Sequence, residues 1–261
     1  MRTVVVADGC TDAGKAISLK AAAAGWNVVA VVPPGTGATW LASEMSTNVH
    51  VREASENSAA GVVRAINTAA VEFGFLDALV NTSHHPHFGT LEWDGVTGAR
   101  EVMERNYFRV LEATAAVLPH LRSTRGRVIT VTDSGPDTTH FSESYRAAQA
   151  ALSAYMDALT PVAAAVNIGV ALVEASIEPG HLPEHLEKNV MRRAGAYRHF
   201  VADHMVGRTD RHRTLSLDDL AEVVTDLLNS KRMPASVRPL PSSWPDGKPM
   251  PHRLPPIRPS R

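Results

Sequence analysis

Short apolar runs alternate with longer segments of helical periodicity along the first two thirds of the chain. The apolar runs are rich in β-branched residues and end at polar, Pro or Gly positions, as strands do. They cover residues 3–8, 27–32, 49–53, 76–83, 126–134 and 168–176. Apolar positions recur at helical spacing in residues 13–25, 59–74, 99–123, 145–165 and 216–230.

This order of elements predicts one α/β domain. Strands that are separated by helices of about 10 residues or more pair in parallel through right-handed crossovers. Strands that are apolar throughout suit a sheet that is covered by helices on both faces. We therefore expect a single domain with a doubly wound, Rossmann-like parallel sheet, whose ligands bind at the carboxyl ends of the strands.

Two segments depart from the alternation. Residues 177–215 are charged and rich in histidine, and we expect a partly helical insertion that forms a substrate lid. Residues 231–261 hold nine of the 17 prolines and seven basic residues against one acidic residue, a composition that cannot build a core. We place the domain at residues 1–240 and a Pro-rich, basic C-terminal arm at 241–261, either disordered or lying across a neighbouring subunit.

Composition narrows the function classes only a little. The 261 residues are 44% hydrophobic and 20% charged, as in ordinary globular proteins. A net charge of −1 gives no reason to expect nucleic acid or an anionic membrane as partner. Cys10 is the single cysteine, so an intrachain disulfide and a thiolate metal cage are excluded. The N-terminus enters a strand directly, without a signal-peptide layout, and no apolar run approaches the roughly 20 residues that cross a bilayer. We expect a cytoplasmic protein.

Several short motifs stand in a characteristic order. FGFLDALVNTS occupies residues 73–83, MERNYFRVLEA contains Asn106, GRVITVTDS covers residues 126–134, and YRAAQAAL begins at Tyr145. In this order and spacing the motifs resemble the short-chain dehydrogenase/reductase family, and the resemblance extends over roughly residues 3–240.

The resemblance implies an oxidoreductase that acts on a small-molecule carbonyl or hydroxyl substrate with NAD(P). In the family a tyrosine exchanges a proton with the substrate oxygen, a lysine lowers the tyrosine pKa, a serine positions the substrate oxygen, and an asparagine supports a water relay. Tyr145 and Asn106 match the tyrosine and the asparagine, but Gln149 stands at the lysine position. The serine position falls on Asp133 by strand alignment, or on Thr132 by spacing to Tyr145. A tyrosine with a pKa of about 10 needs an adjacent cation to act near neutrality.

The cofactor turn also departs from the family pattern. Its glycines allow a tight bend and let the backbone approach a diphosphate at a helix N-terminus. The segment here is ADGCTDAG, and alignment on Gly14 puts Asp8 and Asp12 where the first two glycines are expected. Both acids would add bulk and negative charge beside the diphosphate. Gly9 could restore the turn by a shift of one residue, and Asp12 could be an ordinary N-cap or first-turn acid.

Three further features concern the same edge of the sheet. Asn81 matches the family asparagine after the fourth strand, and Glu53 could match the aspartate that contacts adenine. VVPPGTG, after the second strand, offers neither an acid for the 2′-hydroxyl of NAD nor an arginine for the 2′-phosphate of NADP. For HHPH, residues 84–87, we expect a solvated loop, with a pocket-lining histidine as the alternative, and we expect no metal site.

Cofactor glycines, serine and lysine have all changed, which favours an impaired or silent oxidoreductase homologue with weakened or absent NAD(P) binding. Such a protein would be a ligand-binding protein, or a subunit of a homo-oligomer or of a hetero-oligomer with a relative, packed through residues 99–123 and 145–165. One alternative is an atypical NAD(P)-dependent reductase or dehydrogenase that uses Tyr145. A second is a non-redox lyase or isomerase in which Tyr145 and Asp133 form an acid/base pair. Gln149 would either bind ribose or substrate, or be a surface-like helix residue without a role.

Overall fold

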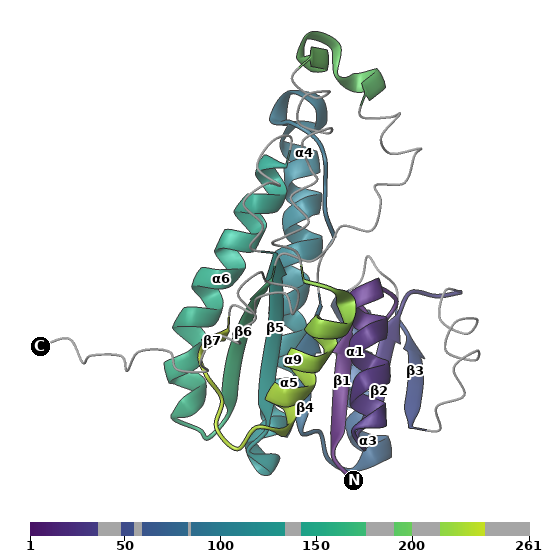
Figure 1. The fold of residues 1–261 in the computed structure, drawn as a ribbon, viewed down its shortest axis with the longest axis vertical. Helices are drawn as coiled ribbons and strands as arrows, with labels where there is room; N and C mark the ends of the chain where they lie inside the picture. Colours follow the sequence, from purple (N-terminus) through teal and green to yellow (C-terminus); the bar gives the residue numbers. More distant parts are fainter. Residues whose placement is uncertain are drawn as a thin grey trace, which may run out of the picture.

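The computed structural model describes residues 1–35, 48–54, 59–82, 85–133, 142–175, 191–199 and 215–237. Within these ranges seven parallel strands form one sheet in the order β3-β2-β1-β4-β5-β6-β7 (Figure 1). The strands are β1 (Thr3–Ala7), β2 (Asn27–Val32), β3 (Val49–Glu53), β4 (Ala78–Asn81), β5 (Arg127–Asp133), β6 (Gly169–Ala175) and β7 (Ser236–Val237). The chain order reverses between β1 and β4, so the doubly wound, Rossmann-like single domain that the sequence predicts is confirmed.

Helices cover both faces of the sheet. They are α1 (Asp12–Ala23), α3 (Ala59–Phe73), α4 (Leu91–Met103), α5 (Arg109–Thr124), α6 (Glu143–Ala164) and α9 (Leu217–Asn229), with a π-helix, η1 (Glu104–Phe108), and a 3₁₀ turn, η2 (Gly195–Tyr197). One apolar core lies between the sheet and the pair α1 and α9, and the other between the sheet and α3, α5 and α6.

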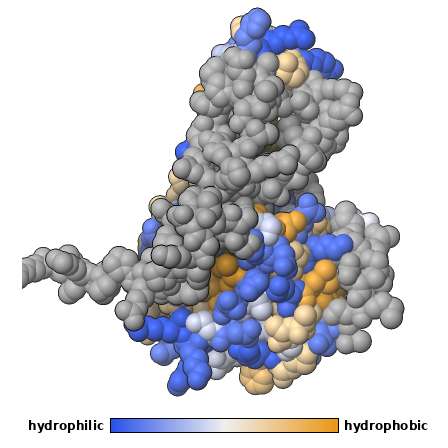
Figure 2. Space-filling model, in the orientation of Figure 1, coloured by the Kyte–Doolittle hydropathy of each residue, from blue (hydrophilic) through white to orange (hydrophobic). Residues whose placement is uncertain are grey.

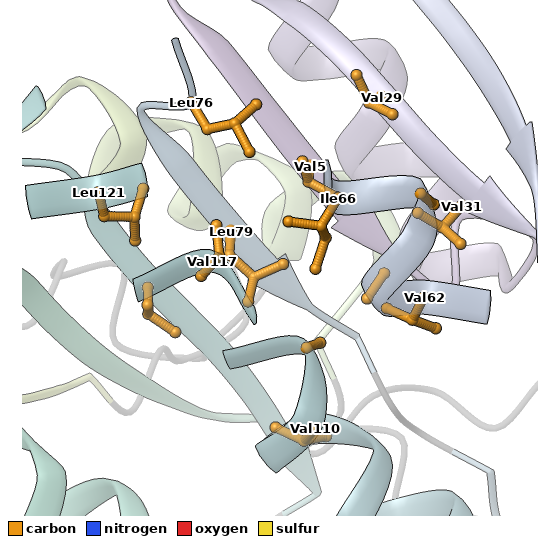
Figure 3. Packing of buried hydrophobic residues seen from close by; sticks show 14 of the residues in the cluster. Val5, Val29, Val31, Val62, Ile66, Leu76, Leu79, Val110, Val117 and Leu121 are labelled. Carbon is orange, nitrogen blue, oxygen red and sulfur yellow. The ribbon is translucent and has the colours of Figure 1, made fainter. Parts of the chain in front are cut away.

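Alternate side chains of each strand supply the two cores. Val5, Val29 and Leu79 point toward α3 and α5, where they meet Ile66 and Val117 (Figure 3). Each of these side chains is fully buried. Burial of one such side chain contributes about 1.5–3 kcal/mol, which explains why the strands are apolar on both faces. The outer face over α1 and α9 is mostly hydrophilic, with scattered hydrophobic residues (Figure 2).

The helix before β5 begins earlier than the sequence pattern predicts. We expect it from residue 99, but α4 begins at Leu91 after Thr90, whose side chain accepts a hydrogen bond from the backbone N–H of Trp93 at 3.2 Å. Gly95, with φ of 61°, interrupts the helical backbone near its start, which hides the periodicity of the first turns. The chain then continues through η1 into α5.

The carboxyl ends of the strands share one edge of the sheet, and α4 and α6 extend beyond that edge (Figure 1). Residues 191–199 lie at the far end of this extension. They and Leu215 are the described part of the predicted lid insertion at residues 177–215, and the predicted C-terminal arm at 241–261 lies outside the described residues. Side chains at the carboxyl edge are therefore the candidates for a functional site.

Candidate functional site

A buried ion pair holds the first βα turn. Asp8 follows β1 with φ of 59°, a left-handed conformation that aspartate tolerates better than most side chains. Its Oδ1 lies 2.7 Å from Nη2 of Arg109, the first residue of α5, and the two side chains are only 2% and 6% exposed. The charge of Asp8 is therefore balanced inside the protein. Arg109 could not be recognised from the sequence, because nothing in the local pattern of α5 indicates a partner 101 residues away.

The remainder of the turn follows from close packing. Thr11 is the N-cap of α1, and its Oγ1 accepts a hydrogen bond from the N–H of Gly14 at 3.0 Å. A Cβ at Gly14 would lie 2.3 Å from the carbonyl oxygen of Asp8, so no larger residue fits. Gly9 donates its N–H to Val31 O at 2.7 Å, and a Cβ on it would lie 2.8 Å from Cβ of Ala30, so glycine is needed there, while Asp8 holds the left-handed position. Asp12 is an exposed first-turn acid.

Tyr145 meets Asp133 at the carboxyl end of β5. The tyrosine side chain on α6 is 1% exposed, and its hydroxyl donates toward Oδ2 of Asp133 at 3.5 Å. Burial raises the pKa of Tyr145 far above its ordinary value, and the charge of Asp133 and the hydrogen bond to it raise the pKa further. Of the two residues that could hold the serine position, Asp133 thus lies beside the tyrosine hydroxyl.

This burial predicts an alkaline loss of stability. The unfolded chain releases the proton of Tyr145 near pH 10, whereas the folded protein keeps it because its pKa is raised. The unfolding free energy should therefore fall above pH 10 by about 1.4 kcal/mol per pH unit from this residue alone. Urea denaturation of the wild type and of Tyr145→Phe between about pH 8 and pH 11.5 measures the difference in slope. Parallel stability curves for the two proteins would contradict the buried, protonated phenol.

Gln149 is buried and bonded, so the interpretation as a surface-like residue without a role is wrong. Its side chain is 5% exposed, and Oε1 accepts a hydrogen bond from the backbone N–H of Asp133 at 3.1 Å. Its Nε2 is buried and has no hydrogen-bond partner among the described residues, and the same is true of Oγ1 of Thr132, which is 2% exposed. An amide at residue 149 therefore fixes the end of β5, which a lysine, having no acceptor, could not do.

The two asparagines are tied to the protein itself. Asn106 lies in η1, where Oδ1 accepts from the N–H of His85 at 3.0 Å and Nδ2 donates to the carbonyls of His85 and Val102 at 3.2 and 3.1 Å. Asn81 is fully buried, and its Nδ2 donates to the hydroxyls of Thr114 and Thr130 at 3.3 and 3.2 Å. Asn106 thus joins η1 to the chain at His85, and Asn81 joins β4 to α5 and β5.

Glu53, the last residue of β3, is hydrogen-bonded to the chain that follows β2. Its Oε1 accepts a hydrogen bond from the backbone N–H of Gly35 at 3.1 Å, and the residue is exposed. This contact joins the ends of β2 and β3. Glu53 therefore lies at the carboxyl edge, apart from the cluster around Tyr145, where an adenosine would be expected in a doubly wound sheet.

The two described histidines after β4 lie near carboxylates, and their side chains are 27% and 36% exposed, so the solvated loop stays a prediction. Nε2 of His85 is buried and lies 3.7 Å from Oδ1 of Asp8. Nε2 of His87 lies 2.8 Å from Oδ2 of Asp94, on α4. His84 lies outside the described residues. Among the described side chains, no group of three or more His, Cys, Asp or Glu could hold a metal ion.

Asp94 also fastens residues 191–199 to the start of α4. Its Oδ1 lies 2.6 Å from Nη2 of Arg193, whose guanidinium lies over the Trp93 ring. Burial tends to raise the pKa of Asp94, but the hydrogen bonds from His87 and Arg193 outweigh it and hold the pKa below its ordinary value. We call His87, Asp94 and Arg193 the Asp94 cluster.

Asp94→Asn should release residues 191–199. The substitution removes the charge that pairs with the guanidinium of Arg193 and is hydrogen-bonded to the ring of His87, which is worth about 1 kcal/mol after allowance for the exposure of Arg193. Amide hydrogen exchange within residues 191–199 should become about five times faster. Asp226→Asn, an exposed carboxylate on α9, is the matched control. Unchanged exchange in Asp94→Asn would mean that the Asp94 cluster does not hold the segment.

The residues at the carboxyl edge differ in charge from the family pattern for a nicotinamide dinucleotide. The N-terminus of α1 carries the exposed carboxylate of Asp12 where a diphosphate would be placed. The pKa of the buried Tyr145 is raised, and Gln149 brings no charge to lower it. Asp8 does not add to the repulsion, since Arg109 balances it.

Comparisons with known proteins agree with the fold. The family model for short chain dehydrogenases matches residues 2–186. Dehydrogenase/reductase SDR family member 7B of Xenopus laevis is 31% identical over 140 residues, covering 51% of this chain and 42% of that protein. 11-beta-hydroxysteroid dehydrogenase A of Sesamum indicum is 30% identical over 152 residues, covering 58% of this chain and 42% of that protein. The chain thus spans less than half the length of these relatives.

Solved structures show the same fold at low identity. A short-chain dehydrogenase from Streptomyces avermitilis superposes with a TM-score of 0.73 at 19% identity and covers 91% of this chain and 88% of that chain. The 3-ketoacyl-(acyl-carrier-protein) reductase from Brucella melitensis, complexed with NADH, gives 0.72 at 18% identity and covers 91% and 96%. In the described ranges, no helix has the length and apolar character that a membrane crossing requires. The chain belongs to the short-chain dehydrogenase family of oxidoreductases.

Proposed function

We propose that this chain is an impaired or silent member of its oxidoreductase family and that it acts as a small-molecule-binding protein. The observation that carries the proposal is the hydroxyl of Tyr145, which is buried and donates toward the carboxylate of Asp133. Burial and the carboxylate of Asp133 both favour the protonated form of this phenol.

Tyr145 is poorly suited to proton transfer near neutral pH. A general acid works best when its pKa lies near the operating pH, and each unit of displacement costs about 1.4 kcal/mol. Burial and Asp133 both move the pKa of Tyr145 away from neutrality. The amide of Gln149 supplies no opposing charge and is already bonded to the backbone of Asp133. The family's tyrosine would therefore be a poor acid in this protein.

Binding of NAD(P) is proposed to be weak or absent. The exposed carboxylate of Asp12 stands in the first turn of α1, where the helix dipole would otherwise attract a diphosphate. Asp8 stands at the other glycine position of the family pattern. Its carboxylate pairs with the guanidinium of Arg109, so this cation is already engaged.

Titration with NADH and with NADPH tests the proposal. A cofactor present at about 100 times its dissociation constant would raise the unfolding free energy by about 2.7 kcal/mol. We expect no comparable stabilisation at millimolar cofactor and no oxidation of NADPH with ketone or aldehyde substrates. Circular dichroism confirms that the sample is folded. Turnover with either cofactor would instead support the atypical reductase or dehydrogenase that uses Tyr145.

The contact between Tyr145 and Asp133 favours one second candidate, a non-redox lyase or isomerase. A carboxylate and a phenol at 3.5 Å can act as base and acid on neighbouring atoms of one substrate. Such an enzyme would exchange a proton next to a carbonyl group without any nicotinamide. Deuterium incorporation into a panel of ketones, lost in both Asp133→Asn and Tyr145→Phe, would support this candidate over a silent protein.

Assembly with a second copy or with a relative is proposed as well. Phe108, just before α5, and Val162, on α6, are large apolar side chains that are 45% and 66% exposed. Phe108 and Val162 lie within residues 99–123 and 145–165, the two segments through which an oligomer is expected to pack. Light scattering coupled to size exclusion measures the mass, and Phe108→Ser with Val162→Ser should shift it toward the monomer.

A further inference from the structure

The side chains at the carboxyl end of β5 carry a charge opposite to that of the family's relay. Asp133 contacts both Tyr145 and Gln149: its Oδ2 lies 3.5 Å from the tyrosine hydroxyl, and its backbone N–H donates to Oε1 of Gln149 at 3.1 Å. Together they bring one carboxylate and no cation. The family's lysine and serine would bring one cation and no carboxylate. The net charge of these positions therefore differs by two units, and a cationic ligand becomes favourable there.

A second observation points to a ligand atom that accepts a hydrogen bond. Oε1 of Gln149 accepts from the backbone of Asp133, which fixes the orientation of the amide and makes Nε2 a donor. Within the described ranges, Nε2 is buried and has no hydrogen-bond partner, and the same holds for Oγ1 of Thr132 on the same strand end. Buried polar atoms are nearly always hydrogen-bonded, so these two are open to a bound molecule.

We infer that this site binds a small molecule in which a protonated amine stands next to a hydroxyl or carbonyl oxygen, as in an amino alcohol. The amine pairs with the carboxylate of Asp133, and the oxygen accepts a hydrogen bond from Nε2 of Gln149. This inference rests on the proposed function, in which Gln149 replaces the family's lysine. A lysine at that position would repel the amine.

Calorimetry with three related probes tests the inference on the full-length wild type. Phenylethanolamine carries both groups, phenethylamine lacks the hydroxyl, and phenylethanol lacks the amine. Phenylethanolamine should bind at least ten times more tightly than phenylethanol and several times more tightly than phenethylamine. Equal affinity for phenylethanolamine and phenylethanol, or no binding of any probe, would overturn the inference.

Two variants assign the contacts. Asp133→Asn should weaken phenylethanolamine at least tenfold, whereas Asp157→Asn, an exposed carboxylate on the same helix α6, should leave the affinity unchanged. Gln149→Met should abolish the preference for phenylethanolamine over phenethylamine. Equal losses in Asp133→Asn and Asp157→Asn would show a general charge effect and overturn the assignment. The probes on the wild type decide the matter even if Gln149→Met does not fold.

The same samples separate this inference from the proposed function. Reduction of a ketone with NADPH would contradict the silent oxidoreductase, whichever probe binds. An absence of turnover together with no preference for the amine would leave the silent oxidoreductase standing and remove only the amine site.

Discussion

Arg109→Met lowers the unfolding free energy by about 3–5 kcal/mol, because it leaves the carboxylate of Asp8 buried without its cationic partner. Both side chains are almost completely excluded from solvent, so water cannot replace the lost contact. Methionine keeps much of the volume and the flexibility of the arginine stem, and the loss can therefore be ascribed to charge. Urea denaturation monitored by tryptophan fluorescence measures the change.

A matched control and a double variant complete this experiment. Arg105→Met removes an exposed arginine four residues earlier and should change the unfolding free energy by less than about 0.5 kcal/mol. Asp8→Asn combined with Arg109→Met removes both charges and should recover a substantial part of the loss. If Arg109→Met behaved like Arg105→Met, the ion pair would have no part in holding the turn.

Asp133→Ser combined with Gln149→Lys lowers the pKa of Tyr145 by about 2 units or more relative to the wild type. The serine removes the carboxylate that raises this pKa, and a nearby ammonium favours the phenolate by about 1–3 units. Burial persists, so the pKa stays above that of a family relay. Tyrosinate absorbance during alkaline titration measures the shift, by difference from the same double variant that also carries Tyr145→Phe.

Single substitutions separate the contributions of residues 133 and 149 to the pKa of Tyr145. Asp157→Ser should leave the titration unchanged, since that carboxylate is exposed on α6. Gln149→Lys alone should lower the pKa less and should also destabilise the fold by about 1–3 kcal/mol, because the N–H of Asp133 loses its acceptor. An unchanged titration in the double variant would refute electrostatic control of Tyr145 by residues 133 and 149.

The sheet and most helices could be predicted from the sequence because their apolar residues repeat with a clear period. β2 and β3 match the predicted strands residue for residue. The start of α4 could not be predicted from the sequence, since Gly95 breaks the helical backbone within the first turns of this helix. Periodicity reports local structure, and a local irregularity removes it.

The site was predicted less completely than the fold. The contact between Asp133 and Tyr145 follows from the strand alignment. For Asp8, the sequence alone predicts a carboxylate that faces a ligand. The structure places Arg109 beside it, and that pairing depends on how β1 and α5 pack. His87 and Asp94 are only seven residues apart, and the N-cap at Thr90 was the available sign that α4 would bring them together.

The hydrogen bond between Gln149 and the backbone of Asp133 limits how this chain could regain hydride chemistry. A lysine gained first would leave a buried N–H without an acceptor, and a serine gained first would face an uncharged amide. Neither step alone restores a useful tyrosine, so the intermediate proteins would be less stable without being more active. For a chain that is silent, as proposed, a return to hydride chemistry would therefore need several simultaneous substitutions.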